Sequence, residues 1–302
     1  MSYVKPAELV TRMVDAGAYK LQMSTRDTLI RSFMGAALLT IAAAFAVTVS
    51  TNTGQPLLGA LLFPVGFVML YLLGYDLLTG VFTLTPLALL DKRPGATIGS
   101  MLRNWGLVFV GNFGGAFMVA ILMAVYFTYG FATEPSAVGH AIGEIGHGRT
   151  VGYADHGAAG MLTLFIRGVL CNWMVSTGVV LAMISDNVLG KIVAMWLPIM
   201  LFFYMGFEHS IVNMFLFPSG LLLGADFTIM DYLIWNEIPT VFGNLVGGLL
   251  FVGLPLYLTH GRTATRRIRA PRATRNSAAR AQVSAPSQPV LAERVAEPAN
   301  VG

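Results

Sequence analysis

Six stretches of the chain are apolar over the length that a membrane-crossing helix needs. A hydrocarbon core is spanned by about 20 consecutive apolar residues in a helix. The six stretches are residues 27–49, 56–90, 98–129, 161–184, 192–224 and 237–260. Of the 302 residues, 55% are hydrophobic and only 11% are charged, and the mean hydropathy is +0.68. This composition excludes an ordinary soluble domain and predicts an all-α membrane protein with six transmembrane helices.

The second and fifth stretches are too long for one straight span, and both are predicted to be broken helices. Each contains a proline and the pattern glycine, aromatic, acid, at residues 74–76 and 206–208. Backbone that leaves a helix at membrane depth is tolerated only where it lines a cavity or is buried in protein. The breaks are therefore expected near Asp76 and Glu208, inside the protein.

Glu208 and His209 are the only side chains between Lys191 and Asp226 that could carry a charge near neutral pH. A charge at the centre of a bilayer costs about 2.5–3.5 kcal/mol on insertion scales. Residues of this kind usually face a cavity and mark an ion or substrate pathway. We therefore expect the pathway of a transported solute at the second break.

The basic residues are distributed on one side of a six-span arrangement. They occur in the N-terminal arm, in the loops after the second and fourth stretches, and in the C-terminal tail: Lys5, Arg12, Lys20, Arg26, Lys92, Arg93, Arg103, Lys191 and the arginines of 262–280. The opposite side has Arg149 among the acids Glu134, Glu144, Asp155, Asp226, Asp231 and Glu237. Since cytoplasmic loops are enriched in Lys and Arg, both termini are predicted to be cytoplasmic, in a multi-pass protein of the cell membrane.

Three parts follow from this pattern. Residues 1–26 are predicted to form an amphipathic N-terminal arm, which either lies on the membrane surface or packs on the helix bundle. Residues 27–260 are the transmembrane domain. Residues 261–302, rich in Arg, Ala, Pro and Ser, are predicted to be a disordered basic tail that can touch anionic lipid.

An internal repeat relates the two halves of the membrane domain. Ile-Arg at 30–31 returns at 166–167, the glycine-aromatic-acid pattern returns at the second break, and Gly-Asn-x-x-Gly occurs at 111–115 and 243–247. The three matches keep one order and a similar offset. Three spans in each half give the halves opposite orientations, and such inverted repeats place the substrate site near the midplane.

Several motifs together resemble the formate/nitrite transporter family. They are Asn-Trp at 104–105, GNFGG at 111–115, RGVLCNW at 167–173, FEHSIVNM at 207–214 and GNLVGG at 243–248. The resemblance covers about residues 25–260. It implies homopentamers with an aquaporin-like fold and one pore in each protomer. It also implies transport of small monovalent anions such as formate, nitrite or hydrosulfide, often coupled to protons.

The resemblance also implies the residues of the pore. The family's central histidine matches His209, and its threonine beside the first break matches Thr79. The family's apolar constrictions match Phe63, Phe67, Phe202 and Leu78, and its pathway asparagines match Asn172 and Asn244. The lysine that the family has in its vestibule is missing here. By distance from Asn172 its place is taken by His156, and Arg149 is the other candidate for this charge.

These residues suggest a mechanism in which the anion meets His209 between the constrictions. Histidine titrates near neutral pH, so it could donate a proton to the anion or offset its charge, while Thr79 hydrogen-bonds the anion from the other half. The simpler alternative is that His209 only bonds the broken backbone. Asp76, Glu208 and Asn112 are expected to support the helix breaks, the acids by accepting freed N–H groups.

Three other functions remain as alternatives. A membrane-embedded enzyme would need a catalytic motif such as His-Glu-x-x-His, and a neutral-solute channel of aquaporin type would be expected to carry paired Asn-Pro-Ala motifs; neither pattern is present. The third alternative is a structural membrane subunit. His140, His147 and His156 are assigned to one solvated loop rather than to a metal site. No cofactor, metal or nucleic acid is expected, and the sequence does not choose among the anions.

Overall fold

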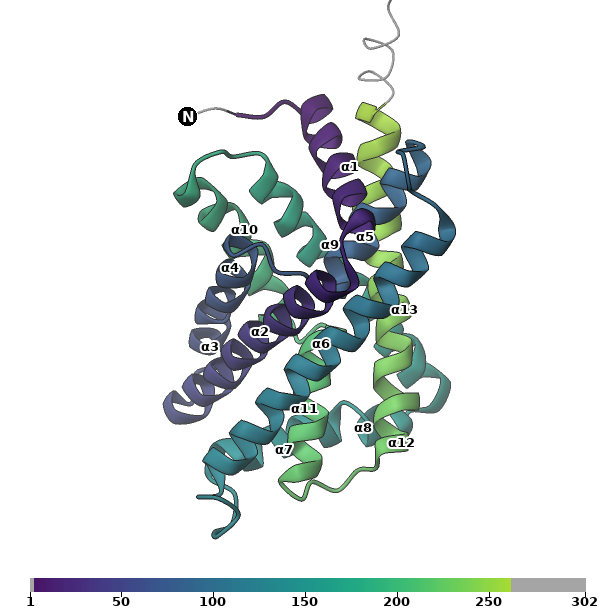
Figure 1. The fold of residues 1–302 in the computed structure, drawn as a ribbon. Helices are drawn as coiled ribbons and strands as arrows, with labels where there is room; N and C mark the ends of the chain where they lie inside the picture. The colour runs from purple at the N-terminus through teal and green to yellow at the C-terminus, as the bar shows by residue number, and fades with distance from the viewer. Residues whose placement is uncertain (1–2, 262–302) are drawn as a thin grey trace, which may run out of the picture. The chain divides into compact units, whose positions relative to one another are not determined.

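The computed structural model describes residues 3–261, and nearly all of their regular structure is helical. The predicted tail from residue 262 onward lies outside the described residues. The first half of the chain forms α1 (Pro6–Gln22), α2 (Thr25–Thr53), α3 (Pro56–Leu62), α4 (Pro64–Leu72), α5 (Leu78–Leu90) and α6 (Ile98–Phe127). The second half forms α7 (Ala137–Gly148), α8 (Val151–Ala154), α9 (Gly157–Met183), α10 (Val188–Tyr204), α11 (Ser210–Leu222), α12 (Ile229–Tyr232), α13 (Ile238–Gly248) and α14 (Leu254–Leu256). Two π-helical segments, Leu233–Glu237 and Leu249–Gly253, join α12, α13 and α14, and a third, Tyr257–Gly261, follows α14, so that one continuous helical rod results (Figure 1).

Four helical segments of the described chain are long and apolar enough to cross a membrane: Thr25–Thr53, Ile98–Phe127, Gly157–Met183 and Ile229–Gly261. The remaining apolar helices are shorter and come in consecutive pairs. Pro56–Leu72 is followed by Leu78–Leu90, and Val188–Tyr204 is followed by Ser210–Leu222. The second and fifth apolar stretches are therefore interrupted, at residues 73–77 and 205–209.

In both interruptions the chain changes direction at a glycine with a left-handed backbone conformation. The φ angle is 72° at Gly74 and 64° at Gly206. Glycine adopts this region at little cost, whereas a side chain would clash with the backbone there. Three residues outside the helices follow each glycine, and the last of them, Leu77 or His209, has an extended backbone. The next half-helix begins directly after that residue.

Glycine also lets two pairs of long helices cross closely. A Cβ atom at Gly115 of α6 would overlap the Phe33 carbonyl of α2, and one at Gly247 of α13 would overlap the Val169 carbonyl of α9. Close approach of this kind is the usual role of small residues in membrane helices. The crossings hold α6 and α13 against the helices that also contact the two breaks.

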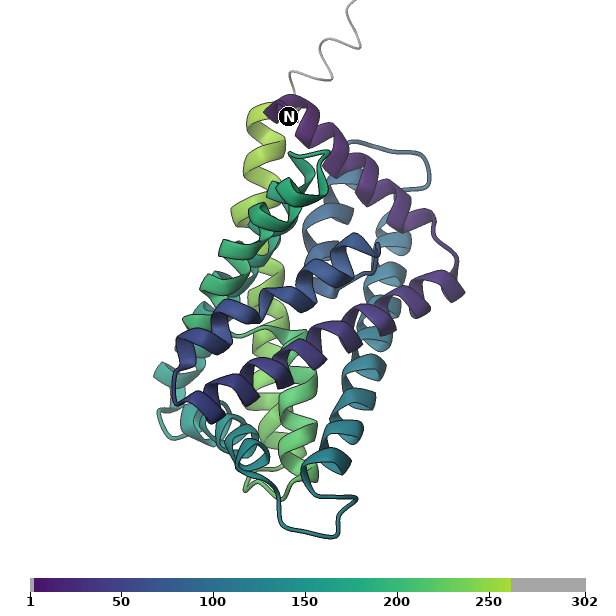
Figure 2. The same cartoon turned by 90° about the vertical axis from the view of Figure 1, so that its left-hand side faces the viewer.

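The N-terminal arm packs on the bundle, which is the second of the two alternatives for this segment. Leu9, Val10, Met13 and Val14 of α1 are buried, and a Cβ at Gly17 would overlap the Leu84 carbonyl of α5. Figures 1 and 2 both show α1 beside the C-terminal end of the last helical rod. An amphipathic helix buries its apolar stripe wherever a partner face is available.

The connection between α6 and α9, predicted to be a solvated loop, is largely helical. Apolar residues recur on one face of α7, where Val138 and Ile142 are buried. Glycines 139, 143 and 146 bring that face against the segment around Leu223, Ala225 and Phe227. The apolar pattern of α7 is short and lies outside the long stretches, so length alone does not indicate a helix here.

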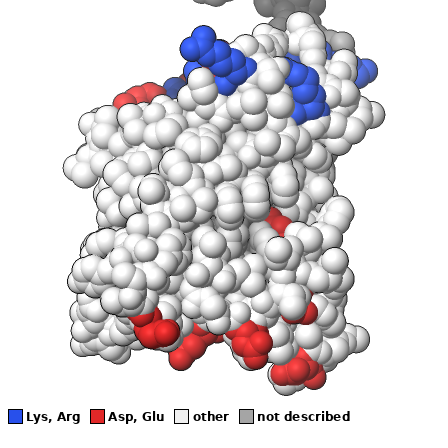
Figure 3. All heavy atoms as spheres, turned by 60° about the horizontal axis from the view of Figure 1, so that its bottom comes forward, with Lys and Arg blue, Asp and Glu red and all other residues white. Residues whose placement is uncertain are grey.

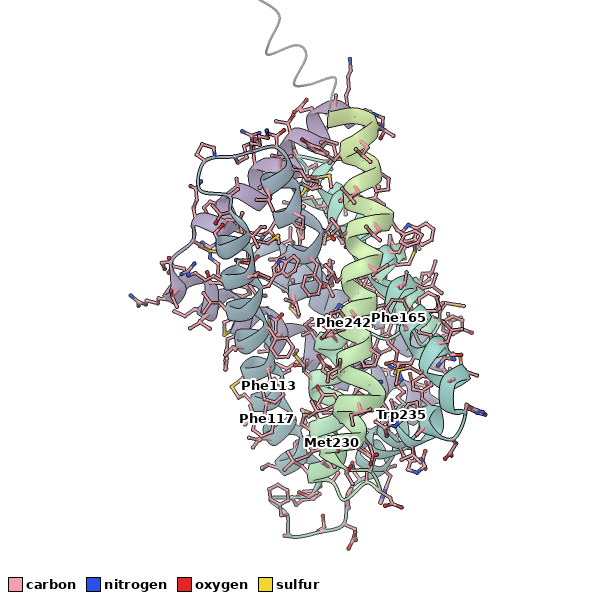
Figure 4. All side chains as sticks on the ribbon, turned by 90° about the vertical axis from the view of Figure 1, so that its right-hand side faces the viewer. Phe113, Phe117, Phe165, Met230, Trp235 and Phe242 are labelled. Carbon is pink, nitrogen blue, oxygen red and sulfur yellow. The ribbon has the colours of Figure 1, made fainter. Side chains whose placement is uncertain are left out.

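Charges separate to the two ends of the described molecule. In Figure 3 the Lys and Arg side chains gather at one end, most Asp and Glu side chains gather at the other, and the band between them is nearly free of charge. Figure 4 shows aromatic and apolar side chains on this band, among them Phe113 and Phe117 of α6 and Phe242 of α13. Phe242 is 58% exposed, as expected of a residue that faces lipid or another subunit.

Candidate functional site

Two cavities reach the two helix breaks, one at each. The first, called the His209 cavity, has a volume of about 490 Å³ and is lined by His209, Phe202, Arg149 and Glu144 among others. The second, called the Thr79 cavity, has a volume of about 150 Å³ and is lined by residues around the first break, including Thr79, Lys20 and Phe67. Each cavity therefore has a polar side chain from the start of a half-helix and a basic side chain in its wall.

An apolar cluster connects the walls of the two cavities. Phe202 stacks on the His209 ring, with centroids 5.4 Å apart, and meets the edge of Phe63 at 5.6 Å. Phe67 lies four residues after Phe63 and lines the Thr79 cavity, while Phe63 and Leu78 line neither of the two cavities. All four side chains, Phe63, Phe67, Phe202 and Leu78, are at most 2% exposed. All four belong to one buried apolar cluster, in which the rings of Phe63 and Phe202 are in direct contact.

His209 stands at the start of α11 with one ring nitrogen engaged and the other free. Its Nδ1 accepts a hydrogen bond from the Val212 amide at 3.4 Å. Its Nε2 is buried and has no hydrogen-bond partner. A neutral imidazole whose Nδ1 accepts carries its proton on Nε2, so this atom is a donor that faces a buried environment unpaired. Leaving such a group unpaired costs about 1–3 kcal/mol.

Thr79 presents a matching unpaired group in the other cavity. Its hydroxyl oxygen is buried and has no partner, and its side chain is 1% exposed. The backbone carbonyl of Thr79 is occupied by the Asn172 amide at 3.1 Å. The hydroxyl is therefore held in place by a fixed backbone and is available to a ligand.

Two asparagines hold the two breaks through the same set of bonds. The Asn112 amide donates to the carbonyls of Asp76 (3.0 Å) and Ser32 (2.7 Å), and its oxygen accepts from the Leu78 N–H (2.9 Å). The Asn244 amide donates to the carbonyls of Glu208 (2.9 Å) and Gly168 (2.8 Å), and its oxygen accepts from the Ser210 N–H (3.0 Å). Each amide thus satisfies backbone groups on both sides of one gap.

The two acids bond to side chains rather than to the freed backbone N–H groups, contrary to the expectation. Asp76 forms an ion pair with Lys20. Glu208 accepts hydrogen bonds from Tyr153 (2.8 Å), Asn213 (2.9 Å) and Asn236 (3.2 Å), and it lies 3.6 Å from Arg149. The reason is chemical: a break exposes both carbonyls and N–H groups, and an amide can serve both whereas a carboxylate only accepts.

Asn172 joins the two breaks without lining either cavity. Its amide nitrogen donates to the carbonyls of Thr79 (3.1 Å) and Asn244 (2.6 Å), and its oxygen accepts from Ser176 (3.0 Å). Asn244 likewise lines neither of the two cavities. Both predicted pathway asparagines are therefore placed behind the cavity walls, where they fix the backbone.

Of the two candidates for the vestibule charge, the structure places Arg149 at the His209 cavity. His156 lines a different hollow, together with Tyr153 and Arg167. Arg149 also contacts the break itself, since its guanidinium lies beside Glu208. Arg149 directly follows α7, which ends at Gly148, and lies near the second break rather than in the hollow lined by His156.

Lys20, Tyr153 and Glu237 also belong to the site, and sequence reasoning did not assign them a role there. Lys20 lines the Thr79 cavity and pairs with Asp76. Glu237 accepts from the Ser210 hydroxyl at 2.6 Å, just after His209. The repeat could have indicated Lys20, because Arg149 occupies a similar place ahead of the second break.

Comparisons with known proteins point in one direction. A family model described as Formate/nitrite transporter matches residues 7–258. A probable formate transporter of Methanothermobacter thermautotrophicus is 33% identical over 274 residues, which cover 86% of this chain and 98% of that protein. The formate channel FocA of Escherichia coli (strain K12) is 29% identical, over 85% of this chain and 94% of that protein.

Solved structures have the same helical fold. A pentameric formate channel with formate bound matches 78% of this chain and 96% of its own length, with a TM-score of 0.65 and 25% identity. An FNT family ion channel matches 83% of this chain and 98% of its own length, with a TM-score of 0.70 and 21% identity. Taken with the family match over residues 7–258, these likenesses show that the chain belongs to the formate/nitrite transporter family.

Proposed function

We propose that this protein transports a small monovalent anion, formate or nitrite, between the Thr79 cavity and the His209 cavity. The observation that carries the proposal is the pair of buried, unpartnered polar atoms, the Thr79 hydroxyl and His209 Nε2, one in each cavity. Both groups can donate a hydrogen bond to an anion. The apolar cluster of Phe63, Phe67, Phe202 and Leu78 separates them and excludes water.

The cavities attract anions and the cluster makes their passage depend on a proton. Lys20 and Arg149 supply one positive charge to each cavity, although each is partly offset by a neighbouring acid. A bare anion loses too much hydration to cross an apolar constriction, while its conjugate acid crosses more easily. His209 is placed to donate a proton, or a hydrogen bond from Nε2, at the edge of this constriction. The rate of anion transport would then depend on the pH on both sides of the membrane.

The proposed layout in the membrane has six spans, built as two inverted halves. It is supported by the two equivalent breaks, each held by an asparagine of the following long helix, and by the four long and two interrupted apolar segments. The concentration of Lys and Arg at the end that carries α1 supports cytoplasmic termini in the cell membrane (Figure 3). The likeness to a pentameric formate channel supports a homopentamer with one pathway in each protomer.

Hydrosulfide or another weak-acid anion is the alternative substrate, because the groups that face the cavities recognise charge and size rather than one chemical structure. The relatives from Methanothermobacter thermautotrophicus and Escherichia coli are a probable formate transporter and a formate channel, which favours formate as the first substrate to test.

The test is anion uptake into proteoliposomes that contain the purified protein. Formate, nitrite and hydrosulfide are compared from mildly acidic to mildly alkaline pH, in the wild type and in His209→Asn. We expect fast flux that increases in acid, and a weaker pH response in the variant, whose amide cannot titrate. Absence of flux of all three anions from folded protein at every pH would refute the proposal. Flux with the same pH response in both proteins would remove His209 from the proton step.

A further inference from the structure

One buried acid beside the second helix break has no basic partner. Glu237 lies in the segment Ile229–Gly261, which is long and apolar enough to cross a membrane, and it lies between Trp235 and Phe242 of the rod in Figure 4. The charge pattern of the sequence placed it with the acids of the outer side, but the structure buries it to 4% exposure. Within residues 3–261 it forms no ion pair. Acids inside a span are rare and usually mark functional sites.

Two hydroxyl groups are the hydrogen-bond partners of Glu237. Its Oε1 atom lies 2.6 Å from Ser210 Oγ, and its Oε2 atom accepts from the Tyr232 hydroxyl at 2.9 Å. Ser210 directly follows His209 and begins α11, and its N–H is held by Asn244. Glu237 itself lines neither the His209 cavity nor the Thr79 cavity. This carboxyl group is therefore connected to the proposed pathway through Ser210.

Glu237 shares this region with a second buried acid, Glu208, which has many more partners. Glu208 accepts three hydrogen bonds and lies 3.6 Å from Arg149. One of the three comes from the amide of Asn236, the residue before Glu237. Where two carboxyl groups share an environment, the one with a cation and several donors keeps its charge, and the other keeps a proton. Glu237 is the second of these two groups.

The neighbouring elements of the described chain provide no cation to Glu237. The π-helical segment that ends at Glu237 packs against α8, α9, α11, α12 and α13, and α11 and α13 have no titratable side chain. Arg149 and Arg167 are engaged with Glu208 and with the Tyr153 hydroxyl. The titratable and charged groups of the remaining elements and of the break are Tyr153, Arg167, Cys171, Asp231, Tyr232, Glu208, His209 and Arg149. A proton is therefore the positive charge left to compensate Glu237.

We propose that Glu237 is a proton-binding site, neutral near neutral pH, and that anion transport requires this neutral form. The proton lies on Oε1, which donates to Ser210 Oγ, a direction that the 2.6 Å separation allows. On ionisation the O–H bond breaks, its electron pair stays on the carboxylate, and the proton passes to water. The Ser210 hydroxyl then donates to Oε1 instead. The new negative charge acts in a region of low dielectric constant and repels an anion at His209.

Infrared difference spectroscopy of the purified protein tests the proton site directly. The wild type is compared with Glu237→Gln, which removes the acid at nearly equal volume, and with Glu134→Gln, an exposed acid, as the matched control. We expect the C=O band of a neutral carboxyl group in the wild type and in Glu134→Gln near neutral pH, fading as the pH rises. This band should be missing from Glu237→Gln. Equal carboxyl bands in all three proteins at every pH would overturn the site.

Anion uptake into proteoliposomes tests the second half of the proposal, which rests on the proposed function. We expect equal flux of the wild type and Glu237→Gln at mildly acidic pH. At mildly alkaline pH the flux of Glu237→Gln should be roughly tenfold higher, because one pH unit above the midpoint of ionisation about nine-tenths of the neutral form is lost. Glu134→Gln should follow the wild type.

Two results of the uptake assay count against the proposal in different ways. The same pH response in the wild type and Glu237→Gln, with the carboxyl band present, would overturn the requirement for the neutral form. Absence of flux from all three proteins would refute the proposed transport and this requirement with it, while the spectra would still decide the proton site.

Tyr232→Phe replaces Glu237→Gln if that variant does not fold. The Tyr232 hydroxyl donates to the carboxylate and so stabilises the ionised form of Glu237. Its removal should shift the loss of the carboxyl band, and the loss of flux, to higher pH. A band that fades at the same pH as in the wild type, or at lower pH, would overturn the assignment to Glu237.

Discussion

The breaks before α5 and α11 share a backbone scaffold and differ in the side chains that surround it. Each has a left-handed glycine and an asparagine that bonds a carbonyl before the gap and an N–H after it. The residue directly before the half-helix is Leu77 in the first break and His209 in the second. The two breaks therefore share their backbone geometry, and an imidazole ring stands directly before the half-helix in the second break only.

The acids of the two breaks, Asp76 and Glu208, also differ in the side chains that surround them. Asp76 has Lys20 as its partner, and its Oδ2 atom is buried without a hydrogen bond. Glu208 is surrounded by three hydrogen-bond donors in addition to the distant contact with Arg149. A buried charge with several donors tolerates the loss of one partner, whereas a charge with a single partner does not. The acid of the first break is therefore held by one ion pair, and the acid of the second break by a network of hydrogen bonds.

The largest effect is expected from removing the asparagines that define the shared scaffold. Asn244→Ala and Asn112→Ala each remove three hydrogen bonds and leave two backbone groups at the gap unpaired, at about 1–3 kcal/mol for each group. Thermal unfolding of the detergent-solubilised protein measures the loss, with exposed Asn52→Ala as the control. Similar, large decreases in Tm would support one scaffold; a decrease in only one variant would mean that the breaks are held differently.

Removing the basic partner of each acid should destabilise the protein to different extents at the two breaks. Lys20→Met leaves Asp76 charged and buried, at a cost of about 3–5 kcal/mol, because removing one partner of a buried pair strands the other. Arg149→Met should cost about 1 kcal/mol or less, since the hydrogen bonds to Glu208 remain. Unfolding measured for both variants tests the difference, and Lys20→Met/Asp76→Asn should recover most of the loss. Equal destabilisation by the two single substitutions would contradict the contrast.

Replacing the histidine should make the second break as apolar as the first. His209→Leu removes the Nε2 donor, and we expect anion flux to fall on the order of 100-fold, the lower range for a lost proton donor. Leu77→Ile, the conservative change at the corresponding position, should leave the flux nearly unchanged. Both are measured as uptake at mildly acidic pH in protein of normal Tm. Full activity of His209→Leu would mean that the pathway does not use this side chain.

A smaller loss of stability than that of the asparagine variants and of Lys20→Met is expected at the turning glycines. Gly74→Ala and Gly206→Ala place a side chain in the left-handed region, at about 1–2 kcal/mol each. The added Cβ has open space at Gly74 and only an ordinary contact with Arg149 at Gly206, so the two losses should be equal. Denaturation of both variants decides this, and a loss at one glycine alone would show that the turns are not equivalent.

Much of this arrangement could be predicted from the sequence because it depends on local patterns. The lengths of the apolar stretches indicated the long helices, and the paired glycine-aromatic-acid patterns located both breaks. The family prediction, and with it transport rather than enzymatic activity, is confirmed by the family match. The roles of individual pore residues stay predictions, and Phe63, Phe67, Phe202 and Leu78 share one buried apolar cluster.

What could not be predicted depends on contacts between distant residues. Lys20 and Asp76 are 56 residues apart, and Tyr153 and Glu208 are 55 apart, so nothing in either local sequence indicates the partner. The prediction that the two acids accept the freed N–H groups was wrong. The sequence shows that an acid lies beside each gap, but it does not show that an asparagine of a later helix bonds the backbone there. The helices between α6 and α9 could not be predicted from the length of an apolar stretch. Their apolar face is short, and its packing partners, Phe217 and Phe227, lie far away in the sequence.

The two hydrogen bonds of the Asn172 amide constrain which substitutions this position can accept in evolution. Its two N–H groups hold Thr79 of α5 and Asn244 of α13, so a substitution at this one position disturbs both cavities together. The side chains at the two breaks differ, as Leu77 and His209 illustrate, while Asn172 ties the backbones of α5 and α13 to each other.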